Sequence, residues 1–348
     1  KTGEAIRNSF RQINMNLVGG IAFLGAMIYC SIFIGDLSFT GFISVATSTQ
    51  LGGSYTFLLV VPLTLFAIAA ITKAAQMPFH TWLLGAMVAP TPTSALLHSS
   101  TMVKAGVFLL VRLAPVFFAC SEPMMGAITG STSLQMPLEV AAFMALPCYM
   151  VVLIGGITFC ICSFIAISQN NAKRVLAYST IANLGLIVAC AGVGTDVAVW
   201  AACFLILFHA IAKSLLFLCV GTAEHHIGSR DIEEMDLLFE RMPKLATCMI
   251  FGILCMFIAP FGMLIAKWAT LASFVETRHF VLLILLAFGS AATFFFWAKW
   301  MGKLSGIAGD PKNVEVTVHK SEWTSILLGL ILAINACLWL PIISLYFV

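Results

Sequence analysis

Long apolar runs, separated by short polar segments, follow one another along the chain. A helix needs about 20 predominantly apolar residues to cross a bilayer, and no strand-like alternation typical of membrane β-barrels is visible. Because lipid offers no partner for an unpaired backbone group, each run is expected to be a helix. The pattern predicts an all-α integral membrane protein with about nine transmembrane helices, at residues 15–35, 55–77, 93–119, 137–167, 174–194, 197–222, 246–275, 279–300 and 323–347.

The composition agrees with a membrane protein and excludes an ordinary soluble domain. Of the 348 residues, 61% are hydrophobic and only 9% are charged, whereas soluble domains carry about 25% charged residues. The mean hydropathy is +1.03. A net charge of +3 gives no reason to expect a nucleic-acid partner, so the first expected partner is the lipid bilayer. We expect a multi-pass protein of the cell (cytoplasmic) membrane.

Eleven cysteines are scattered through the apolar runs without a CxxC pair. We interpret them as small buried hydrophobic residues. No glycine-rich phosphate loop, nucleophile elbow or redox motif is visible either. We therefore expect no catalytic residue, no metal site and no cofactor in this chain.

The basic residues indicate the orientation of the helices. If residues 1–14 are cytoplasmic, successive crossings place twelve of the eighteen Lys and Arg residues on that side and only Arg112 and Arg278 on the other. Such an excess is typical of cytoplasmic loops, and it supports nine crossings. The cytoplasmic set is Lys1, Arg7, Arg11, Lys173, Arg174, Arg230, Arg241, Lys244, Lys299, Lys303, Lys312 and Lys320.

The remaining four basic residues, Lys73, Lys104, Lys213 and Lys267, lie inside predicted spans. A lysine in hydrocarbon costs about 2.5–3.5 kcal/mol on insertion scales, so such residues usually face a bundle interior or a wet cavity. The alternatives are a static ion pair or a side chain that reaches the interface. All fifteen acidic residues fall in loops or at span ends. We therefore expect a carboxylate partner from a preceding segment or a neighbouring subunit.

Two histidines accompany these lysines. His209 and Lys213 are four residues apart and share a helix face, and His98 precedes Lys104 on one predicted helix. Burial disfavours the charged form of lysine, so buried lysines near histidines can pass a proton from one to the next. The alternative is that each histidine is a neutral, hydrogen-bonded core residue.

Two of the predicted spans contain helix breakers. Pro62 lies eleven residues before Lys73, and Pro260 with Gly262 lies shortly before Lys267. Proline kinks or breaks a helix, and broken helices line ion sites in transporters. Two lysines placed after two breaks suggest two related halves, although ordinary proline kinks are the alternative.

The polar segment 224–244 is predicted to be a short amphipathic helix on the cytoplasmic surface. It begins with the neighbouring histidines His225 and His226. Because neighbours on a helix differ by about 100° in direction, we expect these two to point apart, which disfavours a metal site.

Three motifs are long enough to indicate a family: KAAQMPFHTWLLGAMVAPTPTSALLHSSTMVKAG, AKRVLAYSTIANLG and FHAIAKSLLFLCVG. They resemble the proton-conducting, antiporter-like membrane subunits of respiratory complex I, Mrp-type antiporters and energy-converting [NiFe] hydrogenases. The resemblance implies a fourteen-helix fold with two inverted five-helix repeats, each with a broken helix. The nine spans would match helices six to fourteen. Residues 1–119 would complete the first repeat, residues 120–305 would form the second, and residues 306–348 a loop and the final span.

The same resemblance assigns expected roles to the proton-relay residues. Lys73 matches the lysine of the first broken helix, and Lys104 a lysine of the next helix. His98 matches the histidine of the SALxH motif. Lys213 matches the central lysine of the second half, and Lys267 the terminal residue beside the second break.

Two departures from the family pattern matter. The glutamate that pairs with the lysine matching Lys73 belongs to the family's first five helices, outside this sequence. Many members also have a second histidine one turn before the position of His209, where this chain has Leu205. That difference weakens a role for His209 alone.

The expected function is a proton-translocating subunit of a multi-subunit, redox-driven complex without a redox centre of its own. The segments APFGMLIAKW and LAYSTIANLG are most similar to Ech-type energy-converting hydrogenases. The partners would be other antiporter-like or anchor membrane subunits and hydrophilic [NiFe] hydrogenase-like and Fe–S subunits. The alternatives are an Mrp-like Na⁺/H⁺ antiporter subunit, a complex I-type quinone oxidoreductase subunit, and a structural membrane anchor.

Overall fold

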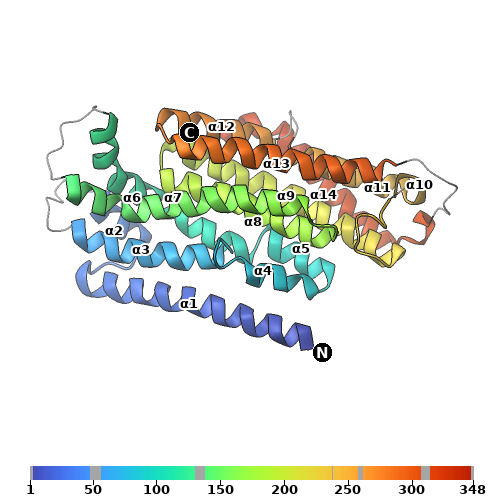
Figure 1. Cartoon of the computed structure of the whole chain (residues 1–348), viewed down its shortest axis with the longest axis horizontal. Coiled ribbons are helices and arrows are strands. Elements are labelled where there is room, and N and C mark those ends of the chain that lie inside the picture. Colours follow the sequence, from blue (N-terminus) through green and yellow to red (C-terminus); the bar gives the residue numbers. More distant parts are fainter. Residues whose placement is uncertain are drawn as a thin grey trace.

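A computed structural model describes residues 3–47, 56–129, 138–236, 238–257, 262–306 and 314–345. These residues form helices and no β-strand, and most of the long helices run roughly along one common direction (Figure 1). The helices are α1 (Gly3–Phe33), α2 (Phe39–Thr47), α3 (Thr56–Lys73), α4 (Thr81–Gly85), α5 (Thr91–Ser99), α6 (Met102–Thr129), α7 (Leu138–Ile167), α8 (Ala172–Val193), α9 (Asp196–Ile227), α10 (Leu238–Arg241), α11 (Pro243–Leu254), α12 (Gly262–Glu276), α13 (Phe280–Leu304), α14 (Lys320–Leu338) and α15 (Leu340–Leu345).

The predicted membrane architecture is confirmed. Within the described ranges, seven helical stretches are long and apolar enough to cross a bilayer, and two shorter apolar helices, Leu58–Lys73 and Pro243–Leu254, supply the remaining two of the nine predicted spans. Both shorter helices adjoin an interruption of the chain. The protein is therefore a multi-pass integral membrane protein. The division of the chain into repeats stays a prediction, and its boundary at residue 119 lies inside α6.

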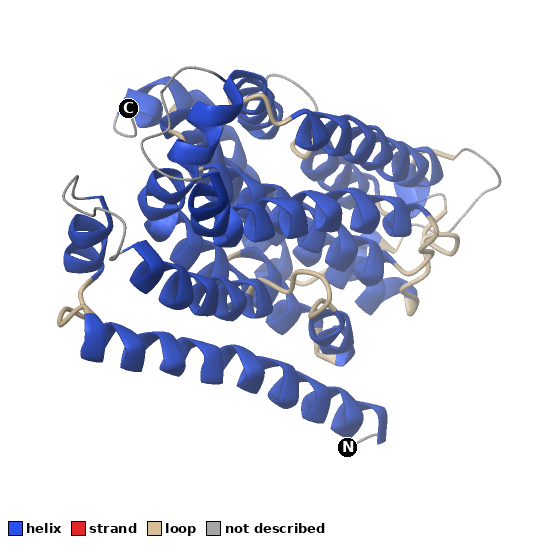
Figure 2. Ribbon diagram, turned by 60° about the vertical axis from the view of Figure 1, so that its left-hand side comes forward, coloured by secondary structure: helices blue, strands red, loops and turns tan. Residues whose placement is uncertain are grey.

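Helix α8 is the centre of the bundle. Its most apolar window is 94% buried, whereas the corresponding windows of α1 and α14 are only 17% buried. Helices α7 and α9 both pack along α8, and α1 lies at one edge of the bundle, against α3 (Figure 2). The bundle thus has a closed core around α8 and two peripheral helices whose apolar outer faces suit lipid or a neighbouring subunit.

Glycines allow α7 and α8 to approach closely. A Cβ added at Gly155 would lie 2.6 Å from the backbone nitrogen of Ala189 and 2.6 Å from the carbonyl oxygen of Gly185. No flexible side chain is present there to move aside. Small residues at such crossings are typical of membrane helix pairs, where van der Waals packing drives association.

The first broken helix ends at Lys73. Beyond it, the amide of Ala75 donates to the carbonyl of Thr72 (3.2 Å), and the amide of Gln76 donates to the carbonyl of Ile71 (3.0 Å). Ala75 has a φ of +52°. This is a Schellman motif, which satisfies the last carbonyl groups of a helix and ends it.

The prediction that Pro62 breaks this helix is wrong. Pro62 lies inside α3, which continues through it, because a single lost backbone bond is tolerated where neighbouring helices compensate. The interruption instead covers residues 74–80, where Ala75 turns the chain. Lys73 therefore precedes the break and lies at the carboxyl end of a helix, where the helix dipole favours a cation.

The second predicted interruption is confirmed in position. Helix α11 ends at Leu254 and α12 begins at Gly262, while Pro260 lies outside the described residues. The ring of Phe208 occupies the space where a side chain at position 262 would lie. Lys267 follows this break in the second turn of α12. The expectation that both lysines follow their breaks is thus wrong for Lys73.

One end of the bundle gathers basic residues and is called here the basic end. Arg11, Arg174 and Arg230 line one cavity of about 590 Å³ there. At the same end Lys303 forms an ion pair with Glu233 at 2.5 Å, and the hydrogen bond from its ammonium lowers the pKa of that carboxyl. These contacts bring together segments that the charge pattern assigned to the cytoplasmic side.

Helix α9 extends further at this end than the sequence suggested. It runs to Ile227 and ends at Gly228, whose φ of +82° suits glycine. The expected amphipathic helix over 224–244 is therefore wrong in its first residues, which belong to α9. Among its later described residues, helix is confined to the short α10 and to the first two residues of α11.

We predict that Gly155→Ala destabilises the protein by about 1–3 kcal/mol, because the added methyl group meets backbone of α8 that cannot yield without moving a helix. Thermal unfolding in detergent measures the effect. Gly302→Ala is the matched control, since nothing lies within 4 Å of its added Cβ. Equal melting temperatures for the two variants would contradict the close packing of α7 on α8.

Candidate functional site

The site is built around His209, in the middle of α9. Its Nδ1 is hydrogen-bonded to Nζ of Lys104 at 3.1 Å. His209 is fully buried and Lys104 is only 7% exposed. The pair joins α9 to α6, and residues 105 positions apart in sequence form one continuous hydrogen-bonded unit inside the bundle.

Lys213 lies one turn further along α9 and is fully buried. Its ammonium donates to the carbonyl oxygen of Leu176 at 3.2 Å and to the hydroxyl of Ser179, both on α8. Nζ also lies 4.9 Å from the centre of the Trp297 ring on α13, a favourable position for a cation. All three partners of this lysine are neutral.

His98 completes the group from α5. Its side chain is fully buried, and its ring lies 5.1 Å from that of Phe217. Neither ring nitrogen has a hydrogen-bond partner among the residues that the structure describes. The predicted single helix carrying His98 and Lys104 is interrupted, because α5 ends at Ser99 and α6 begins at Met102.

These four residues form what is called here the central cluster: His98, Lys104, His209 and Lys213. His209 is close enough to the other three to interact electrostatically with each of them. Lys213 also interacts with Lys104 and His98 in the same way. The structure therefore brings together four of the six residues that the sequence singled out.

Lys73 lies apart from the central cluster and is only half-buried. Its ammonium donates to Oδ1 of Asn16 on α1 at 3.4 Å. It lines a cavity of about 360 Å³ between α1, α3 and α6. The expectation of a deeply buried lysine is wrong here, because the helix ends at Lys73 and its side chain faces the peripheral helix α1.

Lys267 also lies outside the central cluster. It is 8% exposed on α12, and its ammonium lies 5.9 Å from the centre of the Phe159 ring on α7. Further along α12, Thr270 and Ser273 make hydrogen-bond contacts with Cys190 (3.4 Å) and Thr195 (2.9 Å). A line of polar groups thus leads from the region of Lys267 towards the end of the bundle opposite the basic end.

The predicted scarcity of carboxylates around these lysines agrees with the structure. The buried polar and charged side chains of the described residues include no Asp or Glu. None of the ion pairs found among those residues includes Lys73, Lys104, Lys213 or Lys267. The cations face imidazole, hydroxyl, carbonyl and aromatic groups instead.

Sequence reasoning missed one buried ion pair. Lys173, which the charge pattern assigned to the cytoplasmic side, is 1% exposed and lies 2.9 Å from Glu224. Glu224 also pairs with Arg230 and accepts from Thr91 at 2.9 Å. The sequence did contain a signal for this pair, because a short turn joins α8 to α9. Two helices joined in this way run antiparallel, so the start of α8 lies beside the end of α9.

The sequence matches a known family of membrane subunits. A family profile described as "NADH:quinone oxidoreductase/Mrp antiporter, TM" matches residues 1–146 and 127–293. The chain belongs to this antiporter-like family. The resemblance seen in the three motifs is therefore confirmed.

Curated relatives of this antiporter-like chain are similar over most of its length. The A1 subunit of a Na⁺/H⁺ antiporter from Staphylococcus epidermidis is 31% identical over 342 residues, covering 91% of this chain and 39% of that protein. The A subunit of a Na⁺/H⁺ antiporter from Bacillus subtilis is 31% identical and covers 89% of this chain and 38% of its own length. The chain thus spans about two-fifths of the length of these relatives.

Two solved structures share the antiporter-like fold. One chain of the Mrp complex from a Dietzia species superimposes with a TM-score of 0.76 at 25% identity, covering 97% of this chain and 34% of the other. A chain of the membrane-bound sulfane sulfur reductase, an archaeal respiratory membrane complex, gives a TM-score of 0.81 at 20% identity. It covers 100% of this chain and 66% of the other, and it supports the fold alone.

We predict that Glu224→Gln destabilises the protein by about 3 kcal/mol, because it leaves the buried Lys173 ammonium without its carboxylate. The double variant Lys173→Met with Glu224→Gln should cost less than the sum of the two single changes. Thermal unfolding in detergent measures both. Glu233→Gln, at the exposed pair with Lys303, is the control and should change stability by less than about 1 kcal/mol. Additive single effects would show that the two side chains are not coupled.

Proposed function

We propose that this chain conducts protons across the membrane through the central cluster, as part of a Na⁺/H⁺ antiporter complex of the Mrp type. The observation that carries the proposal is the hydrogen bond between Lys104 and His209, one helical turn from the buried Lys213, inside a core without buried carboxylates among the described residues. Lys73 and Lys267 lie outside this cluster and would connect it to the two membrane surfaces.

The chemistry of the cluster suits proton transfer better than static pairing. A buried ion pair lowers the cost of burying a lysine only when a carboxylate is close, and Lys213 has neutral partners instead. Imidazole accepts a proton at one nitrogen and donates at the other. His209 is hydrogen-bonded to Lys104 through Nδ1, and its Nε2 has no hydrogen-bond partner among the described residues. A proton would pass between this nitrogen and Lys213 through water.

His98 supports a hydrated route. Two ring nitrogens buried without a protein partner among the described residues are unusual, since buried polar groups are nearly always hydrogen-bonded to protein or water. A bridging water would satisfy them and would extend the chain of proton carriers from α9 to α5. Such a water needs two to four polar partners, and the surrounding lysines and imidazoles offer them.

The finer assignment to an antiporter complex rests on the relatives. The proteins that match over most of the chain are named as Na⁺/H⁺ antiporter subunits, which favours the antiporter over the expected energy-converting hydrogenase. The lack of a buried Asp or Glu in the described part of the chain disfavours a Na⁺ site within it. This region would then carry the proton pathway, with Na⁺ handled elsewhere in an assembly of membrane subunits.

A redox-driven proton pump is the second candidate. Its support is the overlap in fold with the archaeal respiratory complex. In that case hydrophilic redox subunits would drive the same lysines through changes in electrostatics. No cofactor in this chain is required by either candidate.

We predict that Lys213→Met lowers proton movement at least tenfold in inside-out vesicles that contain the assembled complex. Lys213→Arg should lose a similar amount, because arginine keeps the charge but does not release its proton. Lys244→Met, which removes an exposed cation at the basic end, is the control and should conduct normally. Full activity in Lys213→Arg would mean that the charge alone is needed, as in a structural anchor. Amounts of assembled complex are measured for each variant.

We also predict that proton movement in these vesicles responds to a Na⁺ gradient and not to hydrogen or a quinone reductant. The fluorescence of a pH-sensitive dye after addition of NaCl, with potassium chloride as the control, provides the measurement. A response only to the reductant would replace the antiporter proposal with the redox-driven one while leaving the central cluster in place.

A further inference from the structure

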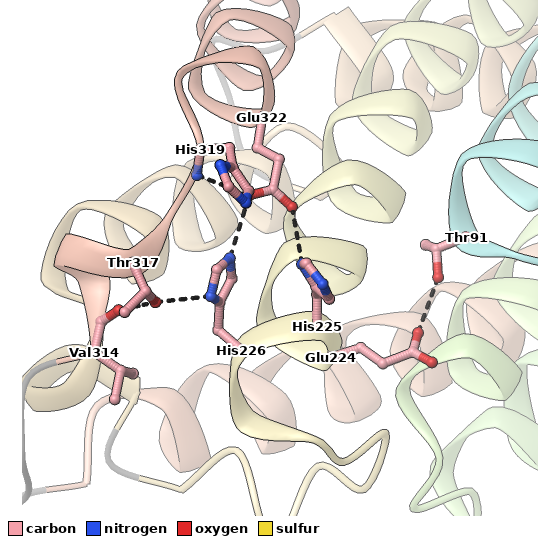
Figure 3. Close-up of polar contacts among 8 residues, drawn as sticks. All are labelled: Thr91, Glu224, His225, His226, Val314, Thr317, His319 and Glu322. Atoms are coloured by element: carbon pink, nitrogen blue, oxygen red, sulfur yellow. Dashed lines mark hydrogen bonds and ion pairs between the residues drawn. The ribbon is translucent and has the colours of Figure 1, made fainter.

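Two histidines and a glutamate converge at the basic end of the bundle, outside the proton pathway. Nδ1 of His225 lies 3.5 Å from one carboxylate oxygen of Glu322, and Nε2 of His226 lies 3.2 Å from the other. Figure 3 shows both rings, from the last turn of α9, directed at the carboxylate at the start of α14. One potential ligand atom from each residue lies within 4.8 Å of the other two.

The expectation that His225 and His226 point apart is wrong. Their directions along α9 do differ, but each side chain has two rotatable bonds, and Glu322 lies between the directions they take. Glu322 is held in this position because its Oε2 accepts the backbone amide of His319 (3.1 Å) in a capping box at the start of α14.

The hydrogen bonds around His226 determine which of its ring nitrogens has a lone pair available for a metal ion. The hydroxyl of Thr317 donates to the carbonyl oxygen of Val314 at 2.7 Å, so it accepts from Nδ1–H of His226 at 2.8 Å. Nε2 of a neutral imidazole then presents a lone pair to a carboxylate oxygen 3.2 Å away. Two lone pairs at this distance repel unless a proton or a metal ion lies between them.

The spacing suits a metal ion. Zinc with ligands at about 2.0–2.2 Å in a tetrahedron places neighbouring ligand atoms roughly 3.4 Å apart. Each imidazole nitrogen lies at a similar distance from one of the two carboxylate oxygens, 3.5 Å for His225 and 3.2 Å for His226. A metal-bound histidine usually fixes its second nitrogen with a hydrogen bond, and a metal-bound carboxylate is hydrogen-bonded in turn. Thr317 and the amide of His319 supply both supports.

An open position is also present. His225 and Glu322 line a cavity of about 690 Å³, and the His225 side chain is 63% exposed. Water from this cavity can reach a fourth position on an ion held by the three side chains. The donor set of two imidazoles and one carboxylate favours zinc or a similar transition metal over Mg²⁺ and Ca²⁺, which prefer oxygen ligands.

We propose that His225, His226 and Glu322 form a binding site for a divalent transition-metal ion, Zn²⁺ foremost, that fastens the start of α14 to the end of α9. Helix α14 is among the least buried spans, so a metal clip at its start would hold it against the core. This site is independent of the central cluster and of the direction of ion transport.

The test is metal binding by the detergent-purified complex after removal of metals with a chelator. Titration calorimetry with Zn²⁺ should show one tight equivalent per chain, and Co²⁺ should give the visible absorption of a tetrahedral site. His226→Ala and Glu322→Gln should each weaken Zn²⁺ binding more than tenfold, and Thr317→Val about tenfold. An excess of Mg²⁺ should not compete.

His279→Ala, which removes a histidine at the other end of the bundle, is the matched control and should bind Zn²⁺ normally. His225→Ala removes an exposed side chain and keeps the metal-free melting temperature, so a loss of binding in it reports on the ligand alone. Unchanged Zn²⁺ affinity in the variant that combines His225→Ala, His226→Ala and Glu322→Gln would assign the binding to other groups and overturn the site. So would a lack of tight binding in the unaltered complex, which would indicate a protonated imidazole paired with the carboxylate.

Discussion

The rest of the site depends on one constraint. Its lysines are buried in an apolar helix bundle, away from any carboxylate of the described residues. Lys104, Lys213 and Lys267 are each less than a tenth exposed. Water or a carboxylate normally compensates a buried ammonium, and here an imidazole, a hydroxyl, backbone carbonyls and aromatic rings do so. Such partners suit both the ammonium and the uncharged amine, as the proposed proton relay requires.

The helix arrangement places these groups with little freedom. His209 and Lys213 lie one turn apart on α9, so the imidazole meets α6 and the ammonium meets α8. Both neighbours belong to the packed core, in which α7 and α8 approach closely through glycines. Rigid packing of this kind holds His209 within hydrogen-bond distance of Lys104. Lys73 and Lys267 lie beside the two broken helices instead.

Much of this could be predicted from the sequence, where local periodicity decides the outcome. The nine spans follow from the length of the apolar runs, the shared face of His209 and Lys213 from their spacing of four, and the family from three long motifs. The positions that were wrong depend on backbone conformation or on contacts between distant segments. No residue pattern indicated a left-handed backbone conformation at Ala75, so the break was predicted at Pro62. The interruption between His98 and Lys104 falls at Ser100 and Thr101, which are ordinary residues in a polar helix.

Distant contacts explain the remaining differences. The sequence of α8 alone places Lys173 at the surface. Lys173 is buried only because α9 runs back along α8 and brings Glu224 beside it. His225 and His226 point apart on an isolated helix, and only Glu322 in the first turn of α14 gives them a common target. In both cases the decisive partner lies about 50 to 100 positions away in sequence.

The most direct test of the central claim is a high-resolution cryo-EM map of the assembled complex that resolves ordered water. The account predicts water at the ring nitrogens of His98, in hydrogen-bonded continuity with Lys213 and His209 and with at least one membrane surface. A dry cluster, with a carboxylate from another subunit or segment paired directly with Lys213, would contradict it and would make these lysines structural.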